Sequence, residues 1–322
     1  MNSLTLQSIV KEFKLTQLNP EVRLKNRLIM VPDVTRPGLQ LTGNFLHFGP
    51  DRIQVMGNME TAYLKSLSSA ERRARMNAIF ATGIPCLILS RGHLPGEEIL
   101  QSAKKYQVPI FGTHETTASF TSSLVKYMNV ELAECISLHG VLVEVYGEGI
   151  LILGKSGVGK SETALEIVKR GHRLIADDIV EVRRVSDTTL LGRAPDIIRH
   201  LIEIRGLGIL DVKELYGVSS VKMQENIHFV INLETWNEDK NYERFGLEQE
   251  TTEVLGIQVP SITIPVRPGR NLAVIVEVAA INWRQKTMGY NAAVALQDRL
   301  LASQQSGAVE PSEGNSAGWS DY

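Results

Sequence analysis

One short stretch of the sequence carries its clearest chemical signal. It reads Gly-Lys-Ser-Gly-Val-Gly-Lys-Ser and matches the phosphate-binding pattern G-x-x-x-x-G-K-[ST] at every fixed position. Glycines in such a loop let successive backbone N–H groups turn toward phosphate oxygens at the start of a helix. We therefore predict a nucleotide-binding loop in which Lys160 neutralises β- and γ-phosphate charge and the Ser161 hydroxyl binds Mg²⁺. The residues of the loop are Gly154, Lys155, Ser156, Gly157, Val158, Gly159, Lys160 and Ser161.

Two adjacent carboxylates, Asp177 and Asp178, follow the apolar segment Leu174–Ala176 shortly after this loop. In open α/β sheets the carboxyl ends of the strands face the ligand crevice. Because neighbouring side chains of a strand point to opposite sides, the two carboxylates should have different roles. We expect one to face metal-bound phosphate and the other an incoming hydroxyl group. A helix N-cap or a turn is the alternative interpretation of the pair.

A second pair of charges, Glu203 and Arg205, alternates with Ile202 and Ile204. The period of two predicts a strand that carries both charges on its outer face, available to a metal ion and a phosphate group. The glycines that follow would on their own indicate only a turn or a β-bulge. His139 ends or interrupts an apolar strand before the loop, and by itself it is more typical of a structural histidine than of a catalyst.

The elements that must position these residues can be traced in the sequence. Ile150–Leu153 is an apolar strand before the loop, and Glu162–Arg170 has apolar residues at helical spacing after it. Upstream, helical and β-type segments alternate, which is the rhythm of βαβ units around a parallel sheet. The helices expected there are Leu4–Phe13, Leu67–Phe80, Gly96–Tyr106 and Thr116–Leu132, and the strands are Arg27–Met30, Leu39–Leu41, Ile53–Val55, Cys86–Leu89 and Val108–Phe111.

We therefore expect an α/β protein with two domains, residues 1–128 and 129–302. The second domain should end in a helix at about Ala279–Leu300, with Trp283 and Met288 partly facing the core. The residues 303–322 are mostly small and polar, which predicts a disordered tail.

The composition narrows the class of protein. The 322 residues include 34 Lys and Arg against 36 Asp and Glu, and the net charge of −2 argues against a general nucleic-acid or membrane-surface binder. The two cysteines have no metal-ligand spacing and favour a reducing compartment. The first residues lack the unbroken apolar core of a secretory signal, and no apolar stretch approaches the length of a membrane span. A folded cytoplasmic protein is expected.

Taken together, these segments resemble the HPr kinase/phosphorylase family, bacterial enzymes that phosphorylate a seryl residue of the phosphocarrier protein HPr and also remove that phosphate. The resemblance is strong from Ser137 to Leu300 and rests more on architecture before that. It implies an N-terminal α/β domain followed by a kinase domain with a phosphate loop, resembling phosphoenolpyruvate carboxykinase. The segments that carry the resemblance are Ser137–Val141, the phosphate loop, Asp177–Asp178, Leu201–Val212 and Pro265–Arg270.

The resemblance also implies roles for individual residues. Asp178 would accept a proton in the kinase direction and donate one in the reverse direction, while Ser161 and Glu203 would hold Mg²⁺. The implied catalytic residues are His139, Lys160, Asp178 and Arg244. The implied catalytic-loop region consists of Ile202, Glu203, Ile204, Arg205, Gly206, Leu207, Gly208, Ile209, Leu210 and Asp211. The turn implied to serve dephosphorylation, whose two arginines can bind phosphate oxygens, consists of Pro265, Val266, Arg267, Pro268, Gly269 and Arg270.

The activity implied by the resemblance has two directions. The first is phosphorylation of HPr on serine with ATP or pyrophosphate as donor and Mg²⁺ as cofactor. The second is removal of that phosphate by inorganic phosphate, with release of pyrophosphate, so that the enzyme regulates carbohydrate metabolism. The implied assembly is a homo-hexamer without nucleic acid or membrane. We expect the C-terminal helix to help dock HPr.

Two other functions remain open on the residues alone. The first is a small-molecule phosphotransferase resembling phosphoenolpyruvate carboxykinase, which would need its own pocket for a carboxylic acid. The second is a nucleotide-dependent regulatory switch, in which slow hydrolysis acts as a timer. The sequence lacks the Asn-Lys-x-Asp motif that selects guanine nucleotides in many such switches.

Overall fold

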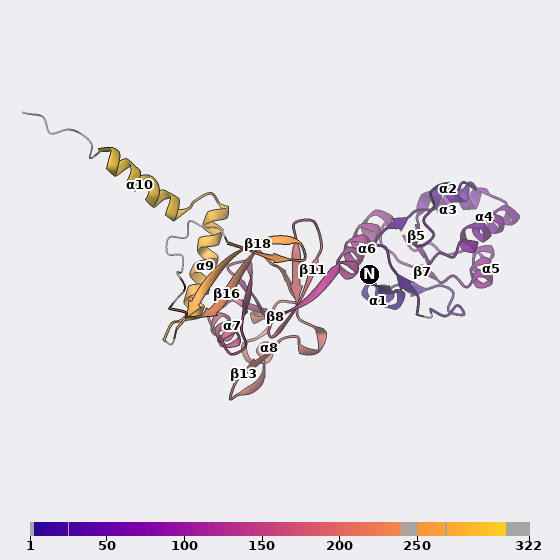
Figure 1. Ribbon diagram of the computed structural model, residues 1–322. Coiled ribbons are helices and arrows are strands. Elements are labelled where there is room, and N and C mark those ends of the chain that lie inside the picture. Colours follow the sequence, from indigo (N-terminus) through magenta and orange to yellow (C-terminus); the bar gives the residue numbers. More distant parts are fainter. Residues whose placement is uncertain (1–2, 25, 239, 241–249, 268, 307–322) are drawn as a thin grey trace, which may run out of the picture. The chain divides into compact units, whose positions relative to one another are not determined.

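The structure is a computed structural model that describes residues 3–24, 26–238, 240, 250–267 and 269–306. The chain divides into two compact units, which are considered separately. The first consists of Met1–Cys135 with Arg183–Asp187, and the second of Ile136–Val182 with Thr188–Tyr322. The elements of both are labelled in Figure 1.

The first unit is built around a five-stranded sheet in the order β2-β7-β6-β5-β4. Strands β4 to β7 are parallel, as the alternation of helices and strands predicts, and β2 is antiparallel to β7. A separate pair of strands joins β1 to β3. The strands are β1 (Leu4–Thr5), β2 (Thr16–Gln17), β3 (Leu28–Ile29), β4 (Val34–Thr35), β5 (Ile53–Met56), β6 (Leu87–Leu89) and β7 (Ile110–Gly112).

Helices cover both faces of this sheet because its central strands are apolar on both sides. In β6, Ile88 packs with α1 and α6, whereas Leu87 and Leu89 pack on the opposite face with α3, α4 and α5. The expected strand Leu39–Leu41 is wrong, because these residues belong to α2, where a short apolar run follows a proline. The helices are α1 (Leu6–Glu12), α2 (Gly38–Leu41), α3 (Asn58–Ser66), α4 (Ser69–Ala81), α5 (Glu97–Tyr106) and α6 (Thr117–Leu132).

The second unit contains a nine-stranded mixed sheet. Its order is β15-β12-β11-β8-β9-β16-β18-β17, and β10 pairs with β8. Strands β9, β16 and β18 are parallel to one another, so their carboxyl ends meet at one edge. The strands are β8 (Glu134–Val145), β9 (Glu148–Gly154), β10 (Arg173–Ala176), β11 (Ile179–Arg184), β12 (Leu190–Arg193), β15 (Gln224–Asn226), β16 (Phe229–Thr235), β17 (Glu250–Val254) and β18 (Ile257–Val266). A separate hairpin is formed by β13 (Leu201–Ile204) and β14 (Gly208–Asp211).

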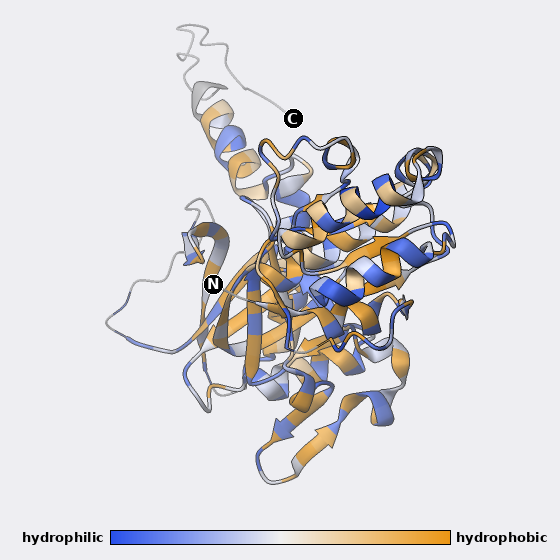
Figure 2. Ribbon diagram, turned by 90° about the vertical axis from the view of Figure 1, so that its right-hand side faces the viewer, coloured by the Kyte–Doolittle hydropathy of each residue, from blue (hydrophilic) through white to orange (hydrophobic). Residues whose placement is uncertain are grey.

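Alternating side chains of the large sheet build two cores. Val141 and Val143 of β8 pack with α7 (Lys160–Lys169) and α9 (Leu272–Thr287), whereas Leu142 between them faces the other core. This period of two places α7 and α9 against one face. In Figure 2 the strands are mostly in the hydrophobic colour, and the helices carry blue stretches. Shorter helical segments are η1 (Asp196–Ile198), α8 (Val212–Tyr216) and η2 (Val218–Ser220).

The end of the described chain differs from the single helix expected at about 279–300. Two helices are present, α9 and α10 (Ala292–Ser306), and Gly289 between them has φ = +95°. Glycine adopts this left-handed conformation readily, and the helical path ends there. Trp283 packs against the core, but Met288, which directly precedes Gly289, is exposed, so the expectation that Met288 partly faces the core is wrong. Residues 303–306 of the expected tail complete α10, and 307–322 lie outside the described residues.

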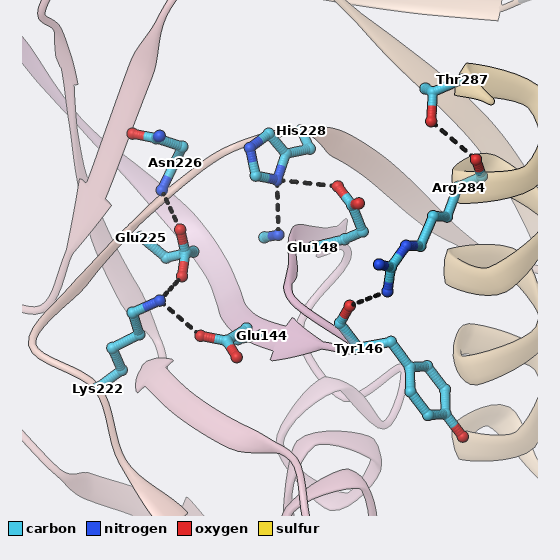
Figure 3. A network of polar contacts seen from close by, with 10 residues as sticks. Glu144, Tyr146, Glu148, Lys222, Glu225, Asn226, His228, Arg284 and Thr287 are labelled. Carbon is cyan, nitrogen blue, oxygen red and sulfur yellow. Dashed lines mark hydrogen bonds and ion pairs between the residues drawn. The ribbon is translucent and has the colours of Figure 1, made fainter.

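A polar network lies around the amino end of β9, opposite to Gly154 (Figure 3). The backbone N–H of Gly149 donates to His228 Nδ1 at 3.0 Å, and Glu148 Oε2 lies 3.1 Å from the same nitrogen. Lys222 bridges Glu144 of β8 and Glu225 of β15. The network therefore ties β8, β9 and β15 together. No helix of the described residues is long and apolar enough to cross a membrane.

Candidate active site

The phosphate-loop sequence lies between β9 and α7, in the predicted order of strand, loop and helix. Gly157 and Gly159 have φ values of +82° and +97°, which other residues adopt only with strain. A Cβ atom on Gly154 would lie 2.5 Å from the carbonyl oxygen of Leu233, so β16 leaves no room for a side chain there. The glycines are therefore required by the backbone path and by close packing.

Lys160 begins α7, and its side chain is buried under the loop. Its ammonium group donates to the carbonyl oxygens of Gly154 (2.9 Å) and Lys155 (3.2 Å) and lies 3.3 Å from His139 Nε2. Burial lowers the pKa of Lys160, and the carboxylates of Asp177, Asp178 and Glu162 oppose that shift. The two carbonyl oxygens thus hold the side chain of Lys160 at the loop.

Asp177 is the buried member of the carboxylate pair. Its Oδ1 accepts a hydrogen bond from the Ser161 hydroxyl at 2.8 Å, and its Oδ2 accepts one from the backbone N–H of Glu203 at 3.2 Å. Burial raises the pKa of Asp177, hydrogen bonds from Ser161 and Glu203 oppose the shift, and the charge of Asp178 adds to it. Asp177 therefore joins the phosphate-loop helix to the β13–β14 hairpin.

Asp178 is exposed and has φ = +65°, in the left-handed region. Aspartate tolerates this conformation better than most residues, and such outliers cluster at functional sites. Its Oδ1 lies 3.0 Å from His139 Nδ1, and its carbonyl oxygen accepts a hydrogen bond from the N–H of Gly140. The two carboxylates thus separate because the chain turns after β10, not because they sit on opposite faces of a strand.

His139 lies inside the continuous strand β8, although the sequence suggested that it ends or interrupts a strand. One of its ring nitrogens faces Lys160 and the other faces Asp178. Position alone made a structural histidine the simpler interpretation. The structure instead places the ring between a cation and a carboxylate at the phosphate loop.

The β13–β14 hairpin has the predicted division of its side chains. Ile202 and Ile204 are buried in the core beside α7, while Glu203 and Arg205 are exposed on the outer side. Arg205 donates to the Ser156 hydroxyl at 3.3 Å, which brings the hairpin against the phosphate loop.

An open cavity of about 120 Å³ joins these features. Charged and hydroxyl side chains dominate its walls, as expected for a phosphate and metal site rather than an apolar pocket. Its lining residues are His139, Ser156, Gly157, Gly159, Lys160, Ser161, Glu162, Asp177, Asp178, Glu203 and Arg205. Of the hairpin, only Glu203 and Arg205 line the cavity, and Leu207 and Ile209 lie outside its walls.

The turn after β18 lies at the same sheet edge as the loop. Leu233 pairs with both Gly154 of β9 and Ile264 of β18, so the two carboxyl ends are two strands apart. The guanidinium of Arg267 lies 3.3 Å from the ring centre of Trp236, and Arg270 donates to the carbonyl oxygen of Pro265. Neither arginine is among the residues that line the cavity. Two expected site residues, Arg244 and Pro268, lie outside the described residues.

Comparisons with known proteins give the family. The family model described as HPr Serine kinase N terminus matches residues 4–128, and the one described as HPr Serine kinase C-terminal domain matches residues 130–300. The HPr kinase/phosphorylase of Caldicellulosiruptor bescii is 55% identical over 296 residues, which are 92% of this chain and 95% of the relative. The chain belongs to the HPr kinase/phosphorylase family.

A second relative agrees with this assignment and confirms the resemblance seen in the motifs. The HPr kinase/phosphorylase of Lachnoclostridium phytofermentans is 51% identical over 300 residues, which are 93% of this chain and 97% of the relative. A solved structure, the Hpr(Ser) kinase/phosphatase from Coxiella burnetii, is 30% identical and covers 54% of this chain and 99% of its own, with a TM-score of 0.45.

Sequence reasoning missed one residue of the cavity, Glu162, and named Asp177 without assigning its role. Glu162 lines it, but a carboxylate in the first turn of a helix is common because it complements the helix dipole. Asp177 was not distinguished from Asp178 as the partner of Ser161. The available signal was weak: Asp177 directly follows a fully apolar strand, which favours the more buried position.

Proposed function

We propose that this member of the HPr kinase/phosphorylase family transfers the γ-phosphoryl group of ATP to a seryl hydroxyl of HPr. With inorganic phosphate it would remove that group again and release pyrophosphate. The observation that carries the proposal is the convergence of Lys160, Ser161, Asp177, Asp178 and Glu203 on one open cavity at the phosphate loop. The names of the relatives supply HPr as the protein substrate.

In the kinase direction, the loop amides and Lys160 would hold the β- and γ-phosphates. A serine hydroxyl is a weak nucleophile until its proton has an acceptor within hydrogen-bond reach. Asp178 is suited to this role, because its carboxylate is exposed at the cavity. His139 contacts that carboxylate and would orient it toward the incoming hydroxyl.

In the reverse direction, inorganic phosphate would occupy the part of the site that holds the β-phosphate of ATP. One of its oxygens would form a bond to the phosphorus of phosphoserine as the bond from phosphorus to the seryl oxygen breaks. Asp178 would return a proton to that oxygen, and pyrophosphate would leave. One loop that can hold two linked phosphates therefore supports both directions. Pyrophosphate can replace ATP as the donor for the same reason.

The oxygen donors around Ser161 suit Mg²⁺. Among the described residues no group of three or more His, Cys, Asp and Glu side chains could hold a metal by itself. Mg²⁺ usually takes one or two carboxylates and completes its shell with water and substrate phosphates, so the Ser161 hydroxyl and Glu203 fit a site that the substrate completes. When bound there, Mg²⁺ would neutralise phosphate charge.

The arginines would act on the transferring or attacking phosphate. We propose that Arg267 and Arg270 bind inorganic phosphate in the dephosphorylation direction and that Arg244 is a further active-site residue. The position of the turn at the edge that carries Gly154 supports the first assignment. Arg267 and Arg270 are both exposed, so phosphate from solution can reach their guanidinium groups.

The wider setting is also proposed. We propose two domains, at residues 1–128 and 129–302, and a homo-hexameric assembly. We also propose a cytoplasmic location and a role in regulating carbohydrate metabolism. All of these fit the family. Neither nucleic acid nor a membrane is expected as a partner, because the net charge is −2.

The proposal is tested by transfer of label from [γ-³²P]ATP. Purified HPr and oxaloacetate are each offered as acceptor with Mg²⁺, and the labelled product is identified. We expect acid-stable label on a seryl residue of HPr. Label on the small acid would instead support a small-molecule phosphotransferase, and slow release of phosphate that HPr does not accelerate would support a nucleotide switch.

A further inference from the structure

The second unit has another cavity at the sheet edge opposite to the phosphate loop. Its walls come from the amino ends of β9 and β18, the residue before β16, part of β12 and the end of α9. The seven residues of β9 separate the two cavities by roughly 20 Å at the usual rise of a strand. The volume of this cavity is about 260 Å³. A ligand smaller than an ordinary drug-sized molecule would therefore fit it.

Glu148 places a carboxylate in the wall of this cavity, beside the ring of His228 (Figure 3). The backbone N–H of Gly149 donates to His228 Nδ1 at 3.0 Å, so this nitrogen is an acceptor and the neutral ring carries its proton on Nε2. Glu148 Oε2 lies 3.1 Å from the same Nδ1. A nitrogen that accepts a hydrogen bond through its lone pair cannot also donate one to the carboxylate. Glu148 therefore faces a lone pair where a proton would stabilise it.

The charge of Glu148 is not paired with a permanent cation. Among the residues that the structure describes, no lysine or arginine forms an ion pair with it. Arg284, which is drawn nearby in Figure 3, donates instead to the carbonyl oxygen of Tyr146 at 3.0 Å. The side chain of Glu148 is only 20% exposed, so water solvates it incompletely. A carboxylate partly removed from water in this way is stabilised by a positive charge beside it.

Trp283 adds an aromatic surface to the same cavity. Its ring stacks on Phe229 with the ring centres 5.3 Å apart and the planes inclined by 19°, which holds it in place. Aromatic rings attract cations to their faces, and tryptophan does so most strongly. Two polar side chains of the wall already have partners, because Gln258 bonds to two side chains of β17 and the Thr287 hydroxyl donates to the backbone of α9. Glu148 is thus the acidic group that the cavity offers to a ligand.

We propose that this cavity binds a small organic cation, an ammonium group carried on an apolar body. The ammonium group would donate to the carboxylate of Glu148 and lie near Trp283. The apolar body would cover the hydrophobic part of the wall, which includes Leu190, Ile227 and Val259. An anion would be repelled by Glu148, so the ligand has the opposite charge to the ligands of the phosphate loop. The inference concerns a second site and does not rest on the proposed phosphoryl transfer.

The test uses three probes of similar size and different charge, titrated into the full chain by calorimetry. They are 2-phenylethylammonium, the neutral 2-phenylethanol and the anion 3-phenylpropionate. Mildly alkaline pH keeps imidazole rings neutral while alkylamines stay charged. Each titration is repeated with saturating ADP and Mg²⁺, because a ligand of this cavity should not compete with a nucleotide at the other end of β9.

Three variants accompany the parent chain. Glu148→Gln removes the charge and keeps the shape of the side chain. Thr287→Trp keeps Glu148 but fills the cavity from an exposed position in its wall. Glu250→Gln is the matched control, because Glu250 is an exposed carboxylate of β17 that does not line the cavity. Thermal unfolding is measured for each variant, so that loss of binding can be separated from loss of the fold.

We expect the parent to bind the ammonium probe with a dissociation constant of about 1 mM or below, with or without ADP. The dissociation constant should rise about tenfold or more in Glu148→Gln, and the neutral probe should bind the parent more weakly by a similar factor. Thr287→Trp should abolish binding, Glu250→Gln should behave as the parent, and the anionic probe should not bind.

Several results would overturn the inference. These are no binding of the ammonium probe to the parent, equal binding of all three probes, or competition with ADP, which would place the probe at the phosphate loop. Unchanged affinity in a folded Glu148→Gln protein would exclude the carboxylate as the anchor. If Glu148→Gln does not fold, Thr287→Trp decides, and binding that persists in that variant would exclude the cavity as the site.

Discussion

Replacement of Lys160 by alanine should abolish both directions of the reaction. The ammonium group is buried and is held by the carbonyl oxygens of Gly154 and Lys155 at 2.9 and 3.2 Å. Loss of one preorganised contact to developing charge costs on the order of 10²–10³ in rate, or about 3–4 kcal/mol of transition-state stabilisation. Both directions should lose at least this much, because the same charge faces phosphate in each.

The effect on folding should be much smaller. The variant removes three hydrogen bonds, to His139, Gly154 and Lys155, each contributing about 1 kcal/mol to stability. It also removes the cost of burying a charge, which is the main reason that the pKa of Lys160 is lowered. We therefore expect the melting temperature to fall by at most a few degrees. Lys160→Arg should not restore activity, because a planar guanidinium cannot replace a compact ammonium group in this space.

The assay measures initial rates of HPr phosphorylation and of phosphate-driven dephosphorylation, together with thermal unfolding. Lys169→Ala is the control, because Lys169 lies on the same helix, carries the same charge and is exposed. A Lys160→Ala enzyme that keeps rates within tenfold of the parent in either direction would refute the argument. So would an unfolded variant, which would make Lys160 a structural residue.

Three further predictions concern the carboxylates and the arginines. Asp178→Asn keeps a residue that tolerates φ = +65° and should lower kcat for seryl transfer by roughly 10²–10⁴, measured at saturating HPr; a normal kcat would exclude it as the proton acceptor. Burial raises the pKa of Asp177, so the folded state binds more protons than the unfolded state. Protonated Asp177 therefore contributes to stability at low pH. This contribution should be lost as pH rises from about 4 through the raised pKa of Asp177. Thermal unfolding at several pH values should show that part of the slope disappear in Asp177→Asn, and an unchanged slope would contradict the assignment. Arg267→Ala and Arg270→Ala should reduce phosphorolysis of phosphoseryl-HPr much more than phosphorylation of HPr, and equal losses in both initial rates would show that the arginines serve a shared step.

The sequence predicted those parts of the fold in which local pattern and burial agree. The strand, loop and helix around Gly154 follow from an apolar run, glycines and helical spacing, all within a short segment. The parallel strands of the first unit follow from the alternation of apolar runs and helical segments. The exposed position of Glu203 follows from the alternation of apolar and charged residues along its strand.

Other features depend on contacts that no local pattern contains. The segment Leu39–Leu41 is too short for its period to distinguish strand from helix, and the structure makes it helical. The break at Gly289 was hidden, because glycine is tolerated in many helices and only the chain path decides whether it ends one. The separate roles of Asp177 and Asp178 arise from a left-handed turn and from the hydrogen bond between Ser161 and Asp177, which joins residues far apart in the sequence.

We propose that one phosphate loop catalyses both transfer to serine and its reversal by phosphate. The most direct measurement starts from HPr that carries ³²P on its serine and adds the enzyme with Mg²⁺ and unlabelled inorganic phosphate. The labelled product is then separated by chromatography. We expect the label to appear in pyrophosphate at a rate that rises with the phosphate concentration, and we expect no labelled pyrophosphate with Lys160→Ala. Label found in inorganic phosphate, at a rate independent of added phosphate, would mean hydrolysis and would contradict the claim.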